Sequence, residues 1–222
     1  MCFNETASLV AFSTGILFCF VLFAKKIPLI YVVLLFSISL IQLVEYFMHK
    51  SITERNSNMN EWSTKLILII LFLQPIAYSY INTRQPLKII HNNNYGQPIM
   101  FIYVLFFICM YIYFDTHHVF KTTYLNPCNT VCRLKWFNLK GLSGILIVLF
   151  FVFYITVFGT FDRDPRFKYR WCEYFIPASL ALACIYAFML APHNKFAAFS
   201  YMGSLWCFLA VFFGPFMLLT YR

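Results

Sequence analysis

The apolar residues of this chain are gathered into long runs separated by short polar breaks. Runs long enough to cross a bilayer lie at about 7–24, 28–48, 64–82, 98–114, 142–161, 172–191 and 196–220. A helix of about 20 apolar residues spans a hydrocarbon core of about 30 Å, and lipid offers no hydrogen-bond partner to an open backbone. The pattern predicts an all-α protein, a polytopic transmembrane helix bundle of about seven spans forming a single domain, 1–222.

The polar breaks predict how these spans are connected. Lys25, Lys26 and Pro28 leave so short a link that the first two spans must form an antiparallel hairpin, and the break at 192–195 predicts the same for the last two. The remaining breaks predict loops, of which 49–63 is markedly polar and 115–141 is the longest. Loops at 49–63 and 115–141 then lie on the same side of the membrane as the N-terminus.

Composition and charge support a membrane location. Hydrophobic residues make up 61% of the chain and charged residues 11%, whereas a soluble domain carries about 25% charged residues. The formal net charge of +9 comes from basic residues in short loops, where they set topology or meet anionic headgroups. We therefore expect the lipid bilayer as a partner and no nucleic acid, and we leave a homo-oligomer open.

The orientation of the chain is only weakly marked. Basic residues are divided almost equally between the two sides of the predicted bundle, so the positive-inside rule does not decide between them. Glu5 precedes the first span and Lys25 and Lys26 follow it. This local asymmetry favours an N-terminus outside the cytoplasm.

Several polar residues are predicted to meet at one membrane surface. Gln42, Glu45 and His49 follow the spacing i, i+3, i+7 near the end of the second span, which places them on one helical face. The fourth span ends on the same side with Asp115, followed by His117 and His118. An ionisable residue within a span is a functional candidate, although Glu45 could instead extend to the interface or pair with His49.

The third span carries a second polar feature. Gln74 and Pro75 lie near its middle. A proline inside a helix frees a backbone carbonyl and can kink the helix, and glutamine can bond to a neighbouring helix. This pair indicates either a packing feature or, together with Gln42 and Glu45, the lining of a path through the membrane.

The cysteines suggest two further possibilities. If the initiator methionine is removed, Cys2 becomes an N-terminal nucleophile that Glu45 or His49 could orient. A disulfide between Cys128 and Cys132 is possible if their loop is extracytoplasmic. Their spacing matches no zinc motif, and neighbouring histidines point in different directions on a helix. We therefore predict neither a metal site nor a cofactor.

The chain contains four short motifs of note, Met1–Phe3, Ile41–Tyr46, Leu73–Pro75 and Cys132–Trp136. Together they resemble the motifs of a family of small multi-pass membrane proteins found in bacteria and in large DNA viruses. Members of that family begin Met-Cys-Phe or Met-Cys-Trp and carry a Gln-x-x-Glu signature late in the second span. The chain departs from the family pattern at Asn4 and Tyr46. The family has no assigned activity, so the resemblance implies a fold and singles out Cys2, Gln42, Glu45 and Gln74.

The sequence leaves three functions open. Bulky aromatic residues and scarce charge within the spans favour a non-enzymatic membrane component. A small transporter or channel would use Gln42, Glu45 and Gln74 to line a path, with proline breaks of the kind that transporters contain. A membrane-embedded enzyme would use Cys2 with Glu45 and His49.

Overall fold

A computed structural model describes residues 5–84, 96–124, 134–159 and 211–220, together with a few helical positions between 178 and 189. Its helices are α1 (Glu5–Ala24), α2 (Leu29–Thr53), α3 (Ser57–Arg84), α4 (Gly96–Thr116), α5 (Leu142–Gly159) and α8 (Phe213–Thr220). Two short strands, β1 (Thr123–Tyr124) and β2 (Leu134–Lys135), lie between α4 and α5.

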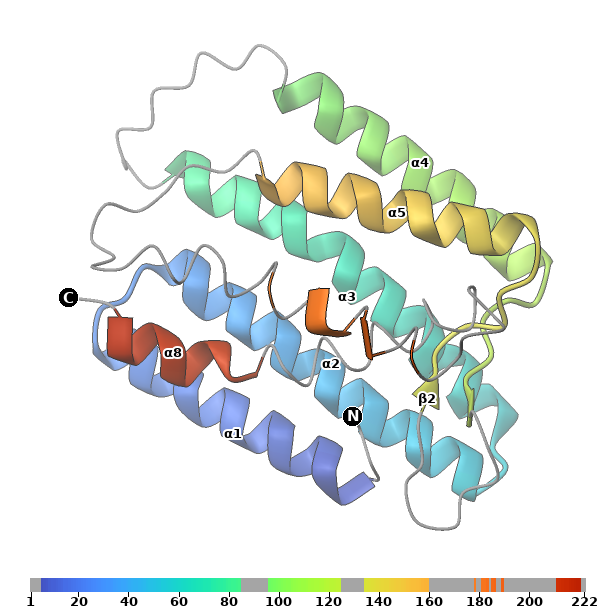
Figure 1. Cartoon of the computed structure of the whole chain (residues 1–222), viewed down its shortest axis with the longest axis horizontal. Coiled ribbons are helices and arrows are strands. Elements are labelled where there is room, and N and C mark those ends of the chain that lie inside the picture. Colours follow the sequence, from blue (N-terminus) through green and yellow to red (C-terminus); the bar gives the residue numbers. More distant parts are fainter. Residues whose placement is uncertain are drawn as a thin grey trace.

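The helices lie side by side along one common direction (Figure 1). Helix α2 lies between α1 and α3, and α5 packs on both α3 and α4. Phe72 of α3 also stacks directly on Phe107 of α4, with ring centroids 3.8 Å apart. Helix α8 packs on α1. The predicted antiparallel hairpin of the first two spans is confirmed, because α1 and α2 are joined by a tight turn and contact each other along their length.

Three of the described helices are long and apolar enough to cross a membrane: Glu5–Ala24, Leu29–Thr53 and Ile99–Thr116. A shorter apolar helix covers Leu142–Tyr154. These helices expose large apolar side chains, among them Phe20 and Phe23 on α1 and Phe101 on α4, as helices that face lipid do. The protein is therefore a helical membrane protein. Most of the predicted span at 172–191 and most of that at 196–220 lie outside the described residues.

The predicted loop at 49–63 is wrong. Helix α2 continues to Thr53 and α3 begins at Ser57, so only a short turn separates them. Asn56 closes both helix ends, since its backbone N–H donates to Ser51 O (2.8 Å) and its Oδ1 accepts from Met59 N (3.0 Å). Satisfying the free backbone groups of two helix ends in this way lets both helices extend through a polar sequence.

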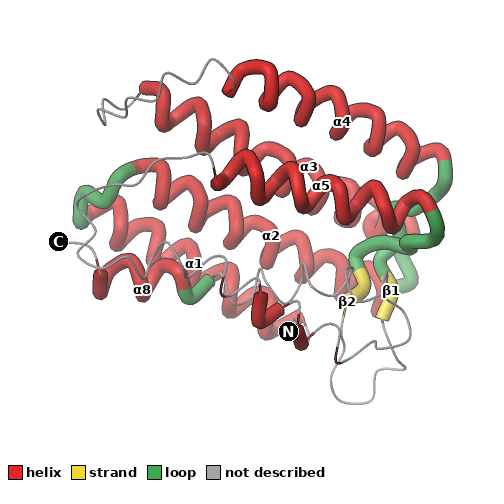
Figure 2. Tube along the Cα trace, turned by 45° about the horizontal axis from the view of Figure 1, so that its top comes forward, coloured by secondary structure: helices red, strands yellow, loops and turns green. Residues whose placement is uncertain are grey.

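The long loop also departs from a purely helical fold. Thr123 pairs with Lys135 and Tyr124 with Leu134 in an antiparallel ribbon. The ribbon lies beside the turn between α2 and α3, at the same end of the bundle (Figure 2). It brings Trp136 and Phe137, both almost fully buried, into the larger apolar core formed by α2, α3, α4 and α5.

Three helices end in the same way. Lys26, Arg55 and His118 follow α1, α2 and α4 with positive φ angles of 56°, 54° and 51°. In each case the next residue donates its backbone N–H to a carbonyl five residues earlier, at 3.1, 2.8 and 2.9 Å. These bonds define the Schellman motif, in which glycine is the usual left-handed residue. Each position here carries a basic side chain, which suits the negative end of a helix dipole.

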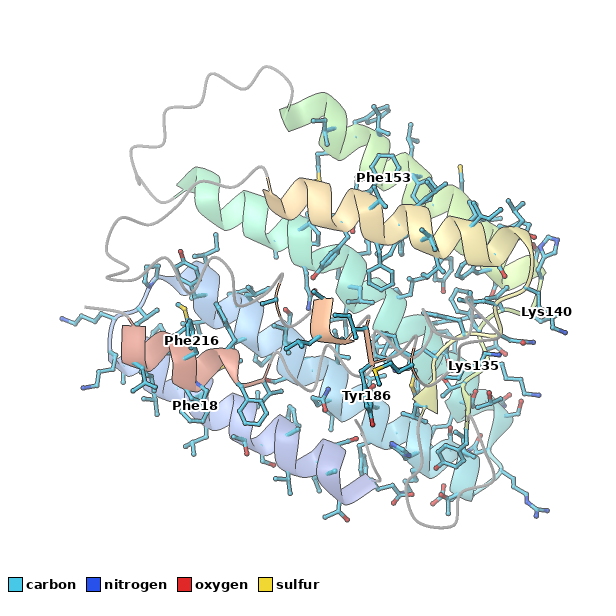
Figure 3. The ribbon with its side chains drawn as sticks, in the orientation of Figure 1. Phe18, Lys135, Lys140, Phe153, Tyr186 and Phe216 are labelled. Carbon is cyan, nitrogen blue, oxygen red and sulfur yellow. The ribbon has the colours of Figure 1, made fainter. Side chains whose placement is uncertain are left out.

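A second apolar core lies between α1, α2 and α8, and glycines allow these helices to pack closely there. A Cβ added at Gly15 would overlap the side chain of Ser39, and one at Gly214 would lie 2.8 Å from Phe18 Cβ. Figure 3 shows Phe18 and Phe216 at this contact between α1 and α8. Glycine at these positions lets neighbouring helices pack without spacing side chains, as is common in membrane bundles.

Candidate functional site

The most deeply buried charged group in the described chain is Glu45 on α2, with no exposed surface. Its Oε1 accepts a hydrogen bond from Trp136 Nε1 at 2.8 Å. Its Oε2 accepts one from Gln42 Nε2 at 3.1 Å, one turn earlier on the same helix. The helical spacing that predicted a shared face for Gln42 and Glu45 is therefore seen as a direct contact. Glu45 is enclosed in the bundle and does not extend to the interface.

His49 lies one turn beyond Glu45 and is also almost fully buried. Its Nδ1 is 3.1 Å from the hydroxyl of Tyr124 on β1, and the two rings are 5.7 Å apart. Burial raises the pKa of the Tyr124 hydroxyl, and the charge of Glu5 adds to this, while a hydrogen bond with Thr53 opposes it. The raised pKa disfavours the phenolate form of Tyr124, and the tautomer of His49 decides which of the two atoms donates.

A second buried network lies next to the first and was not predicted. Asn60 on α3 donates from Nδ2 to Ser51 Oγ (3.0 Å) and to Thr122 O (3.1 Å), and its Oδ1 accepts from Thr122 N (2.9 Å). Thr122 Oγ1 in turn donates to the backbone oxygen of Trp136 (3.1 Å). The side chain of Asn60 thus bonds to both backbone groups of Thr122, as a neighbouring strand would. These bonds hold the segment after α4 against α2 and α3.

An open pocket of about 480 Å³, here called the end pocket, lies beside these networks at the end of the bundle. Ser51, Asn60, Thr122 and Tyr124 belong to both the pocket and the networks. The charged and titratable residues at its wall are Arg55, Glu61, Asp115, His118 and Lys121. The ends of α2 and α4 thus lie at the same end of the bundle, as the predicted connections require.

Lys65 on α3 forms ion pairs with the two acidic residues of the end pocket, Glu61 and Asp115. Its Nζ lies 2.6 Å from Asp115 Oδ1 and 2.7 Å from Glu61 Oε1. The same ammonium lies 5.6 Å from the ring centroid of Phe120, within the range of a cation–π contact. Both carboxylates that line the pocket are thus paired with the same cation, Lys65, which does not itself line the pocket.

Further basic residues lie at this end of the molecule. Figure 3 shows Lys135 on β2 and Lys140 on the loop that leads into α5. The pKa of Lys135 is lowered from its ordinary value, first because burial disfavours the charged ammonium and then because Lys140 carries the same charge nearby. Lys135 and Lys140 therefore lie close enough for their charges to interact.

Gln74 belongs to a separate cluster deeper in the bundle. Its Nε2 donates to Ser37 Oγ on α2 at 2.9 Å, and its Oε1 accepts from the hydroxyl of Tyr154 on α5. The predicted interhelical hydrogen bond of Gln74 is therefore confirmed, and it links three helices. Helix α3 continues through Pro75. Gln74 and Ser37 also line a small groove of about 130 Å³ whose other walls are apolar.

The remaining predicted site residues are dispersed. His117 is exposed and stacks on Tyr113, with ring centroids 4.0 Å apart, whereas His118 faces the end pocket. Cys2, Cys128 and Cys132 lie outside the described residues, so the nucleophile and the disulfide stay predictions. Within the described part of the chain, no three histidine, cysteine, aspartate or glutamate side chains are grouped as metal ligands.

The sequence reasoning missed Trp136, Asn60, Thr122 and Tyr124 as members of the site. Trp136 had a signal, since it ends one of the motifs quoted for the family resemblance, but its partner could not be read from the motif. Asn60 and Thr122 lay in segments interpreted as loops. Comparison of the chain with protein-family models, with curated proteins and with solved structures finds no match.

Proposed function

We propose that this chain is a seven-span integral membrane protein with a non-enzymatic role, in which Glu45 fastens the loop before α5 to the bundle. The observation that carries the proposal is the pair of hydrogen bonds to the two oxygens of Glu45, from Gln42 and from Trp136. A buried carboxylate is tolerated when both oxygens are bonded. The contact then specifies one arrangement of loop and helix.

The location of Glu45 supports this role over a catalytic one. A catalytic carboxyl must reach the reacting atoms within hydrogen-bond distance, in a cleft that admits a substrate. Among the described residues, neither Glu45 nor Gln42 lines the end pocket. A transport role would require a polar path that joins Glu45 to Gln74, and these two residues bond to different partners in separate clusters.

We expect Glu45→Gln to insert and to unfold within about 2 kcal/mol of the wild type. The new amide keeps an oxygen for Trp136 Nε1, and Gln42 can turn its own amide to present its oxygen to the new NH2 group. Glu45→Leu, which removes both acceptors, should be less stable by a further 1–3 kcal/mol, about the cost of leaving a buried donor without a partner. Unfolding in sodium dodecyl sulfate, followed by tryptophan fluorescence, measures both variants.

The same Glu45→Gln protein separates the alternative functions. Reconstituted into liposomes, the wild type and the variant should give the same ion flux as empty liposomes. A wild-type flux that disappears in a folded Glu45→Gln protein would establish the transporter instead. A substrate-derived adduct on Cys2 that forms in the wild type and not in the variant would establish the enzyme.

The proposed topology places the N-terminus outside the cytoplasm and, with seven spans, the C-terminus inside. The start of α1 and the end of α2 lie at one end of the bundle, since Thr53 Oγ1 donates to Glu5 Oε1 at 3.2 Å. We expect an N-terminal epitope tag to bind antibody on intact cells and a C-terminal tag to bind only after permeabilisation. Two tags that behave alike would show an even number of spans.

The family resemblance and the partners are part of this proposal. The Met-Cys-Phe start and the Gln-x-x-Glu signature support a relationship to the family of small multi-pass membrane proteins. The exposed apolar side chains on α1 and α4 support contact with lipid. The same faces could pack copies of the chain together, and cross-linking in native membranes would detect such a homo-oligomer.

A further inference from the structure

We propose that the end pocket binds a phosphate-bearing anion at the membrane surface, with Arg55 and Lys121 as the residues that hold its charge. The inference concerns a ligand site, and it goes beyond the non-enzymatic role proposed above. It rests on the charge balance of the pocket, on its position and on its polar lining.

The charge balance leaves the two cations available. Glu61 and Asp115 are both paired with Lys65, at 2.7 and 2.6 Å. Arg55 and Lys121 line the same pocket and are exposed, and neither forms an ion pair with another described residue. Arginine and lysine are the usual partners of phosphate oxygens, arginine through its planar fork and lysine as a point charge. An entering anion therefore meets two cations that are paired with no described acid. Lys65 balances only one of the two acids, so the three cations and two acids together leave a formal charge of +1.

The pocket also offers neutral donors at a suitable size. Its volume of about 480 Å³ falls within the range of about 300–1,000 Å³ typical of ligand sites. The lining includes two further hydroxyl-bearing residues, Thr123 on β1 and Ser57 at the start of α3. Such hydroxyl groups can donate hydrogen bonds to the phosphate oxygens that are not bonded by Arg55 or Lys121.

The position of the pocket indicates where the phosphate comes from. It lies where α2 and α4 end, just beyond helices long enough to cross a membrane. Lipid phosphates lie at this depth, and basic pockets at the ends of spans bind lipid headgroups. A soluble phosphate ester would carry the same chemistry, so the test must distinguish the two sources.

The helix-end motifs supply a clean set of variants. Arg55 occupies a left-handed position that glycine favours, so Arg55→Gly removes the charge and relieves the backbone at the same time. Lys26 occupies the same position at the end of α1, at the opposite end of α2 from the pocket. Lys26→Gly is therefore a matched control that removes the same charge from the same motif. Lys121→Gln tests the second cation without changing a helix end.

The experiment is titration of the purified full chain, in a non-ionic detergent, with short-chain phosphatidylglycerol, short-chain phosphatidylcholine or inorganic phosphate. We expect Arg55→Gly and Lys121→Gln each to weaken the affinity for phosphatidylglycerol about tenfold or more, and Lys26→Gly to bind as the wild type does. Arg55→Gly should unfold no more easily than the wild type, which excludes a folding defect. Raising the salt concentration should weaken wild-type binding, since the cations are exposed.

The ligand arms identify the source of the phosphate. Tighter binding of phosphatidylglycerol than of inorganic phosphate, with the same dependence on Arg55, supports a lipid headgroup. Tight binding of inorganic phosphate that displaces phosphatidylglycerol supports a soluble phosphate ester. Wild-type affinity for every ligand in both Arg55→Gly and Lys121→Gln, or an equal loss in Lys26→Gly, would overturn the proposal.

Discussion

Replacing Trp136 with alanine is expected to lower the free energy of unfolding by about 3–5 kcal/mol, the usual cost of emptying a buried tryptophan site. Trp136 is 1% exposed and is among the largest fully buried side chains described. The change leaves a cavity and also removes the donor to Glu45 Oε1. Unfolding in sodium dodecyl sulfate at a fixed lipid-to-detergent ratio measures the loss.

Two companion variants divide this effect. Trp136→Phe keeps most of the buried volume and removes only the indole N–H, so it should cost about 1–3 kcal/mol, as expected for one buried acceptor losing its donor. Trp62→Ala removes a tryptophan that is 70% exposed and should cost less than about 1 kcal/mol. If Trp136→Ala were no less stable than Trp62→Ala, the loop before α5 would not be fastened to the bundle as described.

Asn60→Ala is expected to lower the free energy of unfolding by about 2–4 kcal/mol. The change removes three hydrogen bonds at once and leaves the backbone N–H and C=O of Thr122 without the partner that Asn60 supplies. Each buried polar group that loses its partner costs about 1–3 kcal/mol. Hydrogen exchange at the Thr122 amide should become faster in the variant, which connects the stability loss to this contact.

Asn58→Ala is the natural control for this prediction. Asn58 is the same residue type, two positions earlier on the same helix, and it is exposed. Its replacement should change stability by less than about 0.5 kcal/mol. If the backbone N–H of Thr122 exchanged as slowly in Asn60→Ala as in the wild type, the side chain of Asn60 would not be what holds the segment around Thr122.

Local patterns were enough to predict the helices and one contact of the site. The apolar runs predicted the bounds of α1, α2, α4 and α5 to within a few residues. A helix that faces lipid needs a continuous run of apolar residues, and such a run is visible in the sequence. The spacing of Gln42 and Glu45 predicted a shared face, and the two side chains are bonded. Counting the connections also placed the ends of α2 and α4 together, and the contact of Lys65 with Asp115 agrees with this.

The helix ends were harder to predict, because hydropathy marks the edge of the lipid and not the end of a helix. The segment 49–63 is polar, yet most of it extends α2 and α3 beyond the apolar region. The Schellman turn after α4 has a similar consequence for His117 and His118. One side chain packs on Tyr113 and the other faces the end pocket, although the two residues are neighbours.

The partners across the molecule could not be predicted from one sequence. Trp136 and Glu45 are 91 positions apart, and Asn60 and Thr122 are 62 apart. No local rule connects such positions, since their contact depends on how α3, α4 and the ribbon pack. The partners of Gln74 could not be predicted either, because Ser37 on α2 and Tyr154 on α5 are 37 and 80 positions away in the sequence.

The separation of Glu45 from Trp136 bears on how this protein is made. At a synthesis rate of about 5–20 residues per second, the ribosome needs roughly five to twenty seconds to cover the 91 positions from Glu45 to Trp136. During that interval α2 has been synthesised with Gln42 beside its carboxylate, and the indole that later bonds to it does not yet exist. The membrane insertion machinery must therefore accept α2 before its final partner is available, and the locking of the loop marks a late step in assembly.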